Sequence, residues 1–545
     1  MRDAGGGGRI AVVVGEAALG ADLSISCPTL WFRMTKSRLD TPWPPIAITI
    51  FVVCFTFATC YLRLFVFPDI PIFLLGDAIG FVNEGARIVA RQLPYRDFFE
   101  ILPPGTPYTY ALLVRIFGLC NWIPLIVMAG LAATTALLMT LASGRIMRGN
   151  VVALPAVLLA GPILLRSADA THHWFSTALV LAAMLTLMGK ISMLRIAAAG
   201  AFCGAAACFT QTKGAIAVVG FVTYLVWKSW RENSRVPGVW RNCLLLCGTA
   251  LAVFAAVNSY FVAKAGLSRW FYCLVVYPLR YYPAPDLNNW RVIKDEFQAH
   301  QGTASWVPFL FVYCTVPLVY LVFLLVMRRQ WRKDRTRPWN QLLLITVTGI
   351  AMFLAIAPSP SIKRLSTVSP PAMILLVWLL NKPTRVFAVV KMALATLAAA
   401  LAVTAAVHSQ TRPKFYLDLP AGRTAFVDTT AKEEYCWVLT NTHPAQFFWG
   451  LPPLYVPFHL QNPAATESLD TTEYTRPEDI AAVLQALQQH NVPVIILPSE
   501  RLYPLTVNTS SNHALAFVGY LHANYRLTRI FANGDELWEK VGSTP

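Results

Sequence analysis

The chain has 545 residues, of which 56% are hydrophobic and 13% are charged, and its formal net charge is +17. An ordinary soluble protein carries about 25% charged residues, so the composition argues against that class and indicates a helical protein that crosses a membrane many times. The Lys and Arg residues lie mostly in short loops between apolar runs. That placement is typical of a cytoplasmic face beside anionic lipid and argues against nucleic-acid binding.

The first 44 residues form a leader that contains "GGGG" and scattered charges. This segment lacks the layout of a signal peptide. We expect a disordered cytoplasmic leader or, in part, a misassigned start. The eleven cysteines lie mostly inside apolar runs and are interpreted as small packing residues, since no Cys/His set has zinc-finger spacing.

Apolar runs after the leader predict eleven membrane spans. The run at 105–118 is ambiguous, because it is short and carries Arg115. If it does not cross, all the basic loops fall on the same side as the N-terminus, as the positive-inside rule requires. We therefore predict a cytoplasmic N-terminus, an outer C-terminus, and spans near 45–66, 121–143, 150–166, 174–189, 196–210, 214–229, 242–263, 305–327, 341–357, 366–381 and 386–408.

The predicted organisation is thus a leader at 1–44, a membrane domain at 45–408 with a first outer loop at 67–120, and a C-terminal outer domain at 409–545. Within the last part, "RTAFVDT" and "VPVIILP" predict buried strands, and residues 476–490 predict a helix with apolar residues at helical spacing. Residues 525–541 predict a hairpin that turns at Asn533 and Gly534. These patterns predict a small α/β domain.

The first outer loop concentrates the charged residues. Asp77 begins a predicted amphipathic helix at 77–92, expected to lie on the outer membrane surface, and Glu84 follows on nearly the same helical face. A structural interpretation weighs equally: Asp77 could be only a helix cap, and Glu84 could pair with Arg87 or Arg91.

The motifs around this helix resemble a known family. A carboxylate just after the first span, then "QLPYRDF", "PPGTPY" and "FG", resemble the C-type (GT-C) integral membrane glycosyltransferases. The branch that they resemble contains the aminoarabinose transferases, the protein O-mannosyltransferases and the transferases of the lipopolysaccharide core. The resemblance implies that Asp77 is the essential acidic residue. Close family members carry a lysine just before the proline turn, where this chain has Ile101 and Leu102 in "EILPPG", so the usual phosphate contact is not expected at that position. Glu100 and Glu84 are candidate substrate-binding residues.

The second outer turn, "RSADATHHW", supplies further candidates. The resemblance implies that Asp169 is the family's second acidic residue. His172 and His173 are interpreted either as contacts for acceptor or phosphate, or as residues that cap the membrane interface. Asp169 with either histidine leaves a divalent-metal site open, although no third ligand is evident. No cofactor is otherwise predicted.

Later outer loops contribute cations. The resemblance implies that Lys363 or Arg364 faces the donor phosphate, which agrees with the need to stabilise an anionic leaving group. The alternative is that both are cations at the membrane interface. Arg280 lies among tyrosines that fit either a sugar-binding wall or an ordinary aromatic belt. Lys213 is a weaker phosphate candidate.

Together, these features predict an inverting glycosyltransferase of the bacterial inner membrane. Its donor would be a polyprenyl-phosphate sugar, its acceptor the hydroxyl of a glycan, lipid or protein, and its only other partners membrane lipids. Multi-span topology also fits a transporter or lipid flippase, a non-catalytic envelope assembly protein, or a polymerase or ligase with a pyrophosphate-linked donor. The chain shows no internal repeat of the kind common in transporters.

Overall fold

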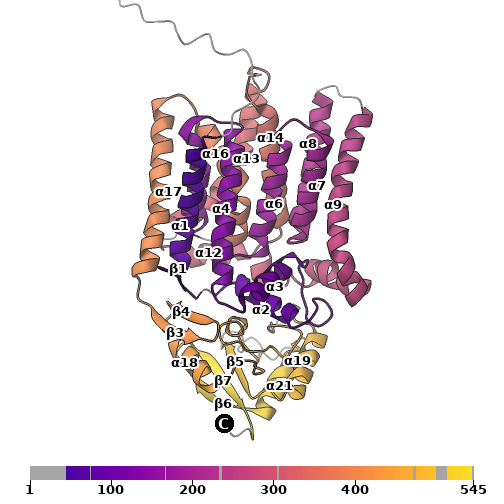
Figure 1. Ribbon diagram of the computed structural model, residues 1–545, viewed down its shortest axis with the longest axis vertical. Coiled ribbons are helices and arrows are strands. Elements are labelled where there is room, and N and C mark those ends of the chain that lie inside the picture. The colour runs from indigo at the N-terminus through magenta and orange to yellow at the C-terminus, as the bar shows by residue number, and fades with distance from the viewer. Residues whose placement is uncertain are drawn as a thin grey trace, which may run out of the picture. The chain divides into compact units, whose positions relative to one another are not determined.

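The computed structural model describes residues 44–542 except 74, 166, 232–235, 304–305, 335, 471–473 and 499–511. The predicted leader therefore lies outside the described residues, apart from Pro44. The described residues belong to a single compact unit. They form a helical bundle, a pair of short helices at one end of it, and a group of α/β elements beyond that pair (Figure 1).

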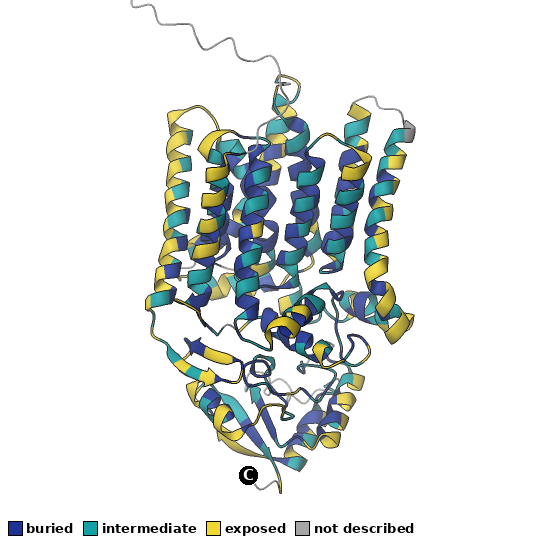
Figure 2. Cartoon of the chain, in the orientation of Figure 1, coloured by how far each residue is buried: buried dark blue, intermediate teal, exposed yellow. Residues whose placement is uncertain are grey.

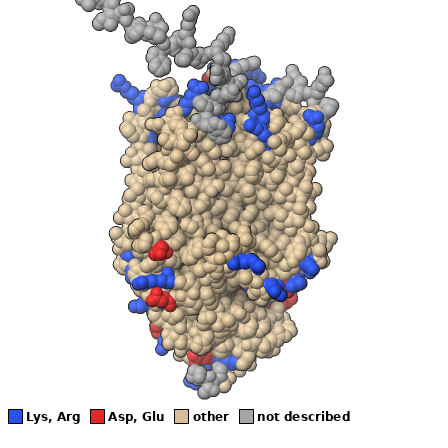
Figure 3. All heavy atoms as spheres, in the orientation of Figure 1, with Lys and Arg blue, Asp and Glu red and all other residues tan. Residues whose placement is uncertain are grey.

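Each of the eleven predicted spans is occupied by helix, and six of these helices are long and apolar enough to cross a membrane. Charged side chains gather near the two ends of the bundle, and a broad uncharged band separates them (Figure 3). The bundle consists of α1 (Ile46–Leu64), α4 (Ile123–Gly144), α5 (Leu154–Leu158) with its flanking turns, α6 (His172–Leu187), α7 (Met193–Ala207), α8 (Gln211–Arg231), α9 (Val236–Ala265), α13 (Trp306–Gln330), α14 (Trp339–Ile356), α16 (Pro370–Leu380) and α17 (Arg385–Thr411).

The segment around α5 departs from regular helix. It begins as a 3₁₀ turn, Gly149–Ala153, and ends as a π-helical turn, Leu159–Ile163, which contains Pro162. Proline removes a backbone donor, so the regular hydrogen-bond ladder is interrupted there. A Cβ atom on Gly161 would lie 2.3 Å from the carbonyl oxygen of Ala398. Glycine therefore lets this turn contact α17 directly.

The ambiguous run at 105–118 forms α3 (Gly105–Phe117), which packs against α2 (Asp77–Val89) at the end of the bundle (Figure 1). Thirteen residues of helix span about 20 Å, which is too short for a hydrocarbon core of about 30 Å. A Cβ atom on Gly85 would lie 2.8 Å from the backbone nitrogen of Ala111. The two helices thus approach each other at backbone distance.

Shorter elements connect the bundle to its outer end. Glu296 fixes the segment that begins at Ile362, because its carboxylate accepts the Ile362 N–H at 2.8 Å and the Tyr313 hydroxyl proton at 2.5 Å. The connecting elements are β1 (Phe65–Val66), β2 (Ile70–Pro71), α10 (Leu267–Phe271), a π-turn (Tyr272–Val276), α11 (Tyr277–Arg280), a 3₁₀ turn (Asp286–Asn288), α12 (Val292–His300) and α15 (Ile362–Val368).

The C-terminal α/β elements contain the predicted strands, helix and hairpin, and these predictions are confirmed. The strands β3 (Phe415–Leu419) and β4 (Gly422–Phe426) pair antiparallel, and an antiparallel sheet has the order β5 (Val494–Pro498), β7 (Asp535–Lys540), β6 (Tyr525–Ile530). The helices are α18 (Lys432–Asn441), α19 (Pro477–Gln489), α21 (Leu515–Asn524) and a 3₁₀ turn, Pro452–Leu454. Their core is buried and apolar (Figure 2).

The predicted amphipathic helix at 77–92 forms as α2, and the C-terminal elements cover its polar side. The Asn83 side chain of α2 donates to Glu467 at 2.7 Å, and both Asn83 and Glu84 are buried. Hydrogen bonds from Asn121 to Thr424 (2.9 Å) and between His459 and the Leu119 carbonyl (3.0 Å) join the same surfaces. The apolar stripe of α2 packs on α3 and the bundle, while its polar side meets the C-terminal elements.

Candidate functional site

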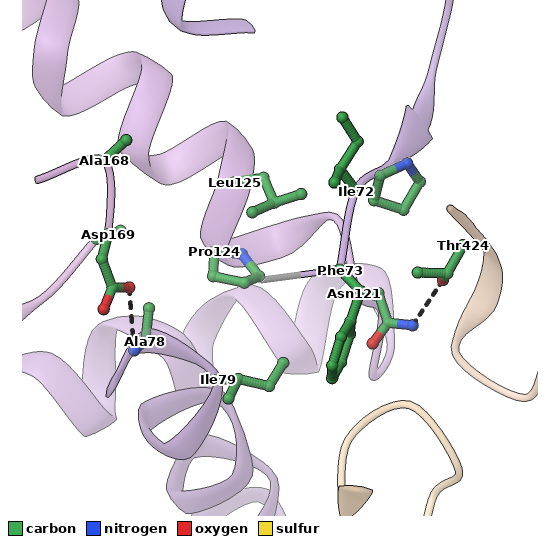
Figure 4. A pocket seen from close by; sticks show the side chains of 12 residues that line it. Ile72, Phe73, Ala78, Ile79, Asn121, Pro124, Leu125, Ala168, Asp169 and Thr424 are labelled. Atoms are coloured by element: carbon green, nitrogen blue, oxygen red, sulfur yellow. Dashed lines mark hydrogen bonds between the residues drawn. The ribbon is translucent and has the colours of Figure 1, made fainter. Parts of the chain in front are cut away.

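Asp169 caps the helix that begins at Asp77. Its carboxylate oxygens accept the backbone N–H of Asp77 at 2.9 Å and that of Ala78 at 3.2 Å. Figure 4 shows the second of these bonds. A helix N-terminus leaves these donors unpaired and favours a nearby negative charge. A Cβ atom on Gly76 would lie 2.5 Å from Asp169 Oδ2. The loop before α6 and the start of α2 are therefore held together by one carboxylate.

Asp77 itself is not the helix cap. The residue is exposed, and among the described residues its side chain has no hydrogen bond or ion pair. The capping role that the structural interpretation gave to Asp77 belongs to Asp169. An exposed carboxylate on the first turn of a fixed helix is available to a ligand. The arrangement therefore leaves Asp77 open as a proton acceptor.

The pKa of Asp169 is shifted because its carboxylate is buried close to other charged groups. Burial and the neighbouring Asp77 carboxylate raise its pKa to about 6, against the lowering effect of Lys363 and the two backbone hydrogen bonds. Lys363 lies on α15, a helix far away in sequence. The chain thus brings two carboxylates and a lysine from three separate outer loops to one place.

Lys363 and Asp169 both line a cavity of about 360 Å³ beside the ends of α1 and α17. The same cavity is lined by Arg63, His408 and Arg412, so cationic side chains outnumber its one carboxylate. A cavity of this size and charge suits an anionic group such as a phosphate. On the other side of Asp169, the pocket drawn in Figure 4 has room for only about 20 Å³ and cannot hold a sugar.

Arg364, the next residue on α15, is held in a defined orientation. It donates to the Tyr282 hydroxyl at 2.6 Å, to Asn288 Oδ1 at 3.2 Å and to the Ser359 carbonyl at 3.3 Å. Burial raises the pKa of Tyr282, and Asp77 raises it further, while Arg364 lowers it. Arg364 is thereby anchored to the segment that contains Tyr282 and Asn288.

A second cavity lies between α2, the turn after Phe98 and the C-terminal elements. It measures about 190 Å³, and its lining includes Glu84, Glu100, Glu467 and Asp479. Burial raises the pKa of both Glu84 and Glu100, and the neighbouring Glu100 carboxylate raises that of Glu84 further. Burial likewise raises the pKa of Glu467 to about 7. The predicted pairing of Glu84 with Arg87 or Arg91 is absent among the described residues.

Two tyrosines, Tyr474 and Tyr282, pack together beside this acidic cavity. The rings of Tyr282 and Tyr474 lie 6.1 Å apart, and Tyr474 lines the cavity. Burial raises the pKa of Tyr474, with further contributions from Tyr282, Glu100 and Asp77. Tyr474 therefore lines the acidic cavity and packs against Tyr282, the residue that Arg364 contacts.

His172 and His173 begin α6 and are half-buried, with ring centroids 4.0 Å apart. Their Nδ1 atoms are buried and unpartnered among the described residues. Lys213 was a weak phosphate candidate, but it is buried and donates to the His173 carbonyl, Thr177 Oγ1 and Thr367 Oγ1 at 2.9–3.1 Å. With three donors engaged, Lys213 holds α6, α8 and α15 together and cannot bind phosphate.

Arg280 is exposed and lies over the Tyr281 ring at 5.4 Å, whereas the neighbouring Tyr282 accepts a hydrogen bond from Arg364. For a metal, the part of the chain that the structure describes contains no group of three or more His, Cys, Asp or Glu residues arranged to hold one. Both carboxylate oxygens of Asp169 already accept backbone N–H groups. The residues present do not fit the metal site that the sequence left open.

Sequence reasoning did not find several residues that the structure brings to these cavities. Glu467 and Tyr474 lie in a loop of the C-terminal elements, and Arg63, His408 and Arg412 lie at the ends of spans. Arg63 and Arg412 carried a usable signal, because both lie on the side that loop charge predicts to be the outer one, where basic residues are depleted. No sequence pattern pointed to the two loop residues, Glu467 and Tyr474.

No family model and no curated protein matches this chain. Among solved structures, the chain is similar to ArnT from Cupriavidus metallidurans bound to undecaprenyl phosphate, with 14% identity, a TM-score of 0.57, and coverage of 91% of this chain and 98% of that one. It also matches the oligosaccharyltransferase AglB from Archaeoglobus fulgidus, in complex with an inhibitory peptide and a dolichol-phosphate, with 13% identity, a TM-score of 0.48, and coverage of 92% and 74%. The predicted fold class, a multi-span helical GT-C protein with a C-terminal α/β region, is confirmed.

Proposed function

We propose that this protein is a membrane glycosyltransferase that transfers a sugar from a polyprenyl-phosphate donor to an acceptor hydroxyl on the outer face of the bacterial inner membrane. One observation carries the proposal. The exposed Asp77 carboxylate stands beside Asp169, and the cationic cavity that contains Lys363 adjoins the same capping loop. The similar ArnT structure holds undecaprenyl phosphate, a lipid phosphate of the class proposed here.

The proposed chemistry uses the negative charge of Asp77 and the positive charges of Lys363 and Arg364. Asp77 takes the proton of the acceptor hydroxyl, whose oxygen then attacks the anomeric carbon of the donor sugar. The bond between that carbon and the phosphate oxygen breaks, and the electron pair leaves with the polyprenyl phosphate. Lys363 and Arg364 stabilise the negative charge that develops on this leaving group. A single displacement of this kind inverts the anomeric configuration.

The remaining residues have supporting roles in the proposal. Asp169 fixes the start of α2 and hence the position of Asp77. The acidic cavity, with Glu84 and Glu100, accepts hydroxyl hydrogens of a sugar. His172 packs edge to face on Phe81 of α2, and the unpartnered ring nitrogens of His172 and His173 are assigned to substrate contacts in this proposal. Arg280 contributes at most to the exposed rim.

The proposal is tested by sugar transfer from a panel of radiolabelled polyprenyl-monophosphate sugars, with purified full-length protein and acceptor-containing membrane extract. We expect turnover by the wild type, loss of turnover in Asp77→Asn, and turnover close to wild type in Asp69→Asn. Asp69 is an exposed carboxylate of the same outer loop that lines neither cavity, so it controls for the loss of charge. Equal turnover in all three proteins would remove Asp77 as the base. Lipid movement across vesicles without sugar transfer would favour a flippase.

A further inference from the structure

A cavity at the opposite end of the bundle is not used by the proposed chemistry. Gln211, at the start of α8, donates to the Ile101 carbonyl of the first outer loop, so the end of α8 at Arg231 lies at the far end of the bundle (Figure 1). There, a cavity of about 460 Å³ is lined by Trp227, Met327, Arg328, Trp331 and Arg332. Lys and Arg side chains are frequent at this end (Figure 3).

The walls of this inner cavity are fixed by aromatic contacts. The rings of Trp227 and Trp331 meet edge to face, with centroids 5.2 Å apart. The Arg231 guanidinium lies 4.1 Å from the centre of the Trp331 ring and donates to Asn340 Oδ1 at 2.7 Å. Arg231 therefore holds the two tryptophans against the start of α14, and the cavity has a defined shape.

The other two arginines are not neutralised. Among the described residues, neither Arg328 nor Arg332 makes a hydrogen bond or an ion pair, and both are exposed. The nearby Asp334 accepts from Arg337 at 2.7 Å and from Thr336 at 2.6 Å, so its charge is already engaged. The inner cavity thus offers two guanidinium groups, the side chain best suited to bind phosphate oxygens in pairs.

A stripe of exposed leucines on the surface of α13 lies next to these arginines. Leu318, Leu321 and Leu325 of α13 are 52%, 56% and 50% exposed. Their spacing of three and four residues places them on one face of the helix, and Arg328 continues that face at the next step of three. An exposed leucine stripe that ends at cations and tryptophans matches the profile of a phospholipid, with acyl chains beside the stripe and a phosphate at the cations.

We propose that the inner cavity binds the headgroup of an anionic phospholipid. Its phosphate contacts Arg328 and Arg332, its glycerol region lies against Trp331, and its acyl chains follow the leucine stripe of α13. The charge of the cavity selects anionic over zwitterionic headgroups. This site is separate from the proposed transferase site and does not depend on it.

The test measures lipid retention by native mass spectrometry of the purified full-length protein in neutral detergent, titrated with phosphatidylglycerol or phosphatidylcholine. The variant Arg328→Gln/Arg332→Gln is compared with Arg329→Gln/Lys333→Gln, a matched pair on the same segment that does not line the cavity. We expect phosphatidylglycerol to bind the wild type and the matched control alike, and the first variant about tenfold more weakly.

Three outcomes would overturn the proposal. Equal weakening of phosphatidylglycerol binding in both double variants would show that the general surface charge, and not the cavity, causes the effect. Equal retention of phosphatidylcholine and phosphatidylglycerol by the wild type would remove the selection by charge. A third arm adds inorganic phosphate alone and follows thermal stability. Protection by free phosphate equal to that by phosphatidylglycerol would assign the cavity to a soluble anion.

Discussion

The Asp169 carboxylate accepts the backbone N–H of Asp77 at 2.9 Å, so the second acidic residue of the outer loops fixes the position of the first. The two carboxylates therefore have different tasks. Asp169 has both oxygens engaged in the helix cap, whereas Asp77 is exposed and open to a ligand. A loss of Asp169 is expected to act through the geometry of Asp77, and a loss of Asp77 through chemistry alone.

This division predicts different results for the two Asn variants. Asp169→Asn keeps one acceptor oxygen and loses the other, and loss of a helix cap costs about 0.5–2 kcal/mol of stability. We expect a lower melting temperature together with a reduced kcat. Asp77→Asn is expected to melt like the wild type while kcat falls about 10²–10⁴-fold. Thermal unfolding and transfer kinetics on both variants check this, and a normal melting temperature in Asp169→Asn would contradict the capping role.

Gly76→Ala provides a steric test of the same contact. The added Cβ would lie 2.5 Å from Asp169 Oδ2, and the backbone at Gly76 is extended, so the expected cost comes from the clash alone. Overpacking of this kind costs about 1–3 kcal/mol. Gly130→Ala, within α4, is the matched control, because no heavy atom of the described residues outside the local helix backbone lies within 4 Å of its added Cβ. We expect a reduced melting temperature and activity in Gly76→Ala and neither in Gly130→Ala; equal behaviour of the two would show that the contact is unimportant.

The orientation of Arg364 leads to a third prediction. Arg364→Lys keeps the positive charge but loses the planar fork that reaches both Tyr282 and Asn288. If the guanidinium stabilises the leaving phosphate, kcat should fall by about 10²–10³-fold, with a smaller change in the donor KM. Tyr282→Phe removes only one anchor and should lower kcat less. Steady-state kinetics with varied donor separate these effects, and a change confined to KM would point to ground-state binding instead.

The membrane part of the fold could be predicted from the sequence because each span contains its own apolar run. The charge of the loops then indicated that the ambiguous run at 105–118 does not cross the membrane. The C-terminal hairpin was equally local, since Asn533 and Gly534 specify its turn. Both features depend on residues that are neighbours in the chain. Sequence patterns of this kind report periodicity and turn chemistry directly.

The site was only partly predictable, because its contacts join segments that are distant in sequence. Glu467 lies 384 residues from Asn83, and no local pattern marks this pairing. The amphipathic pattern of α2 was correctly recognised, but the pattern alone does not show that the polar face meets Glu467 and the C-terminal elements. Lys213 was misjudged for the same reason: its partners Thr177 and Thr367 come from two other helices.

Glu467 also gives the protein a predicted pH dependence. Burial raises its folded-state pKa from the ordinary value near 4.5 to about 7. The folded state therefore binds the proton more tightly than the unfolded state does, so the contribution of Glu467 to stability is complete below pH 4.5 and is lost as the pH rises through 7. We expect the melting temperature of the wild type to fall between pH 5 and pH 8 by more than that of Glu467→Gln, which cannot titrate. Glu478→Gln removes an exposed carboxylate of the same domain and should follow the wild type. Parallel pH profiles for the wild type and Glu467→Gln would show that the acidic cavity does not hold this proton.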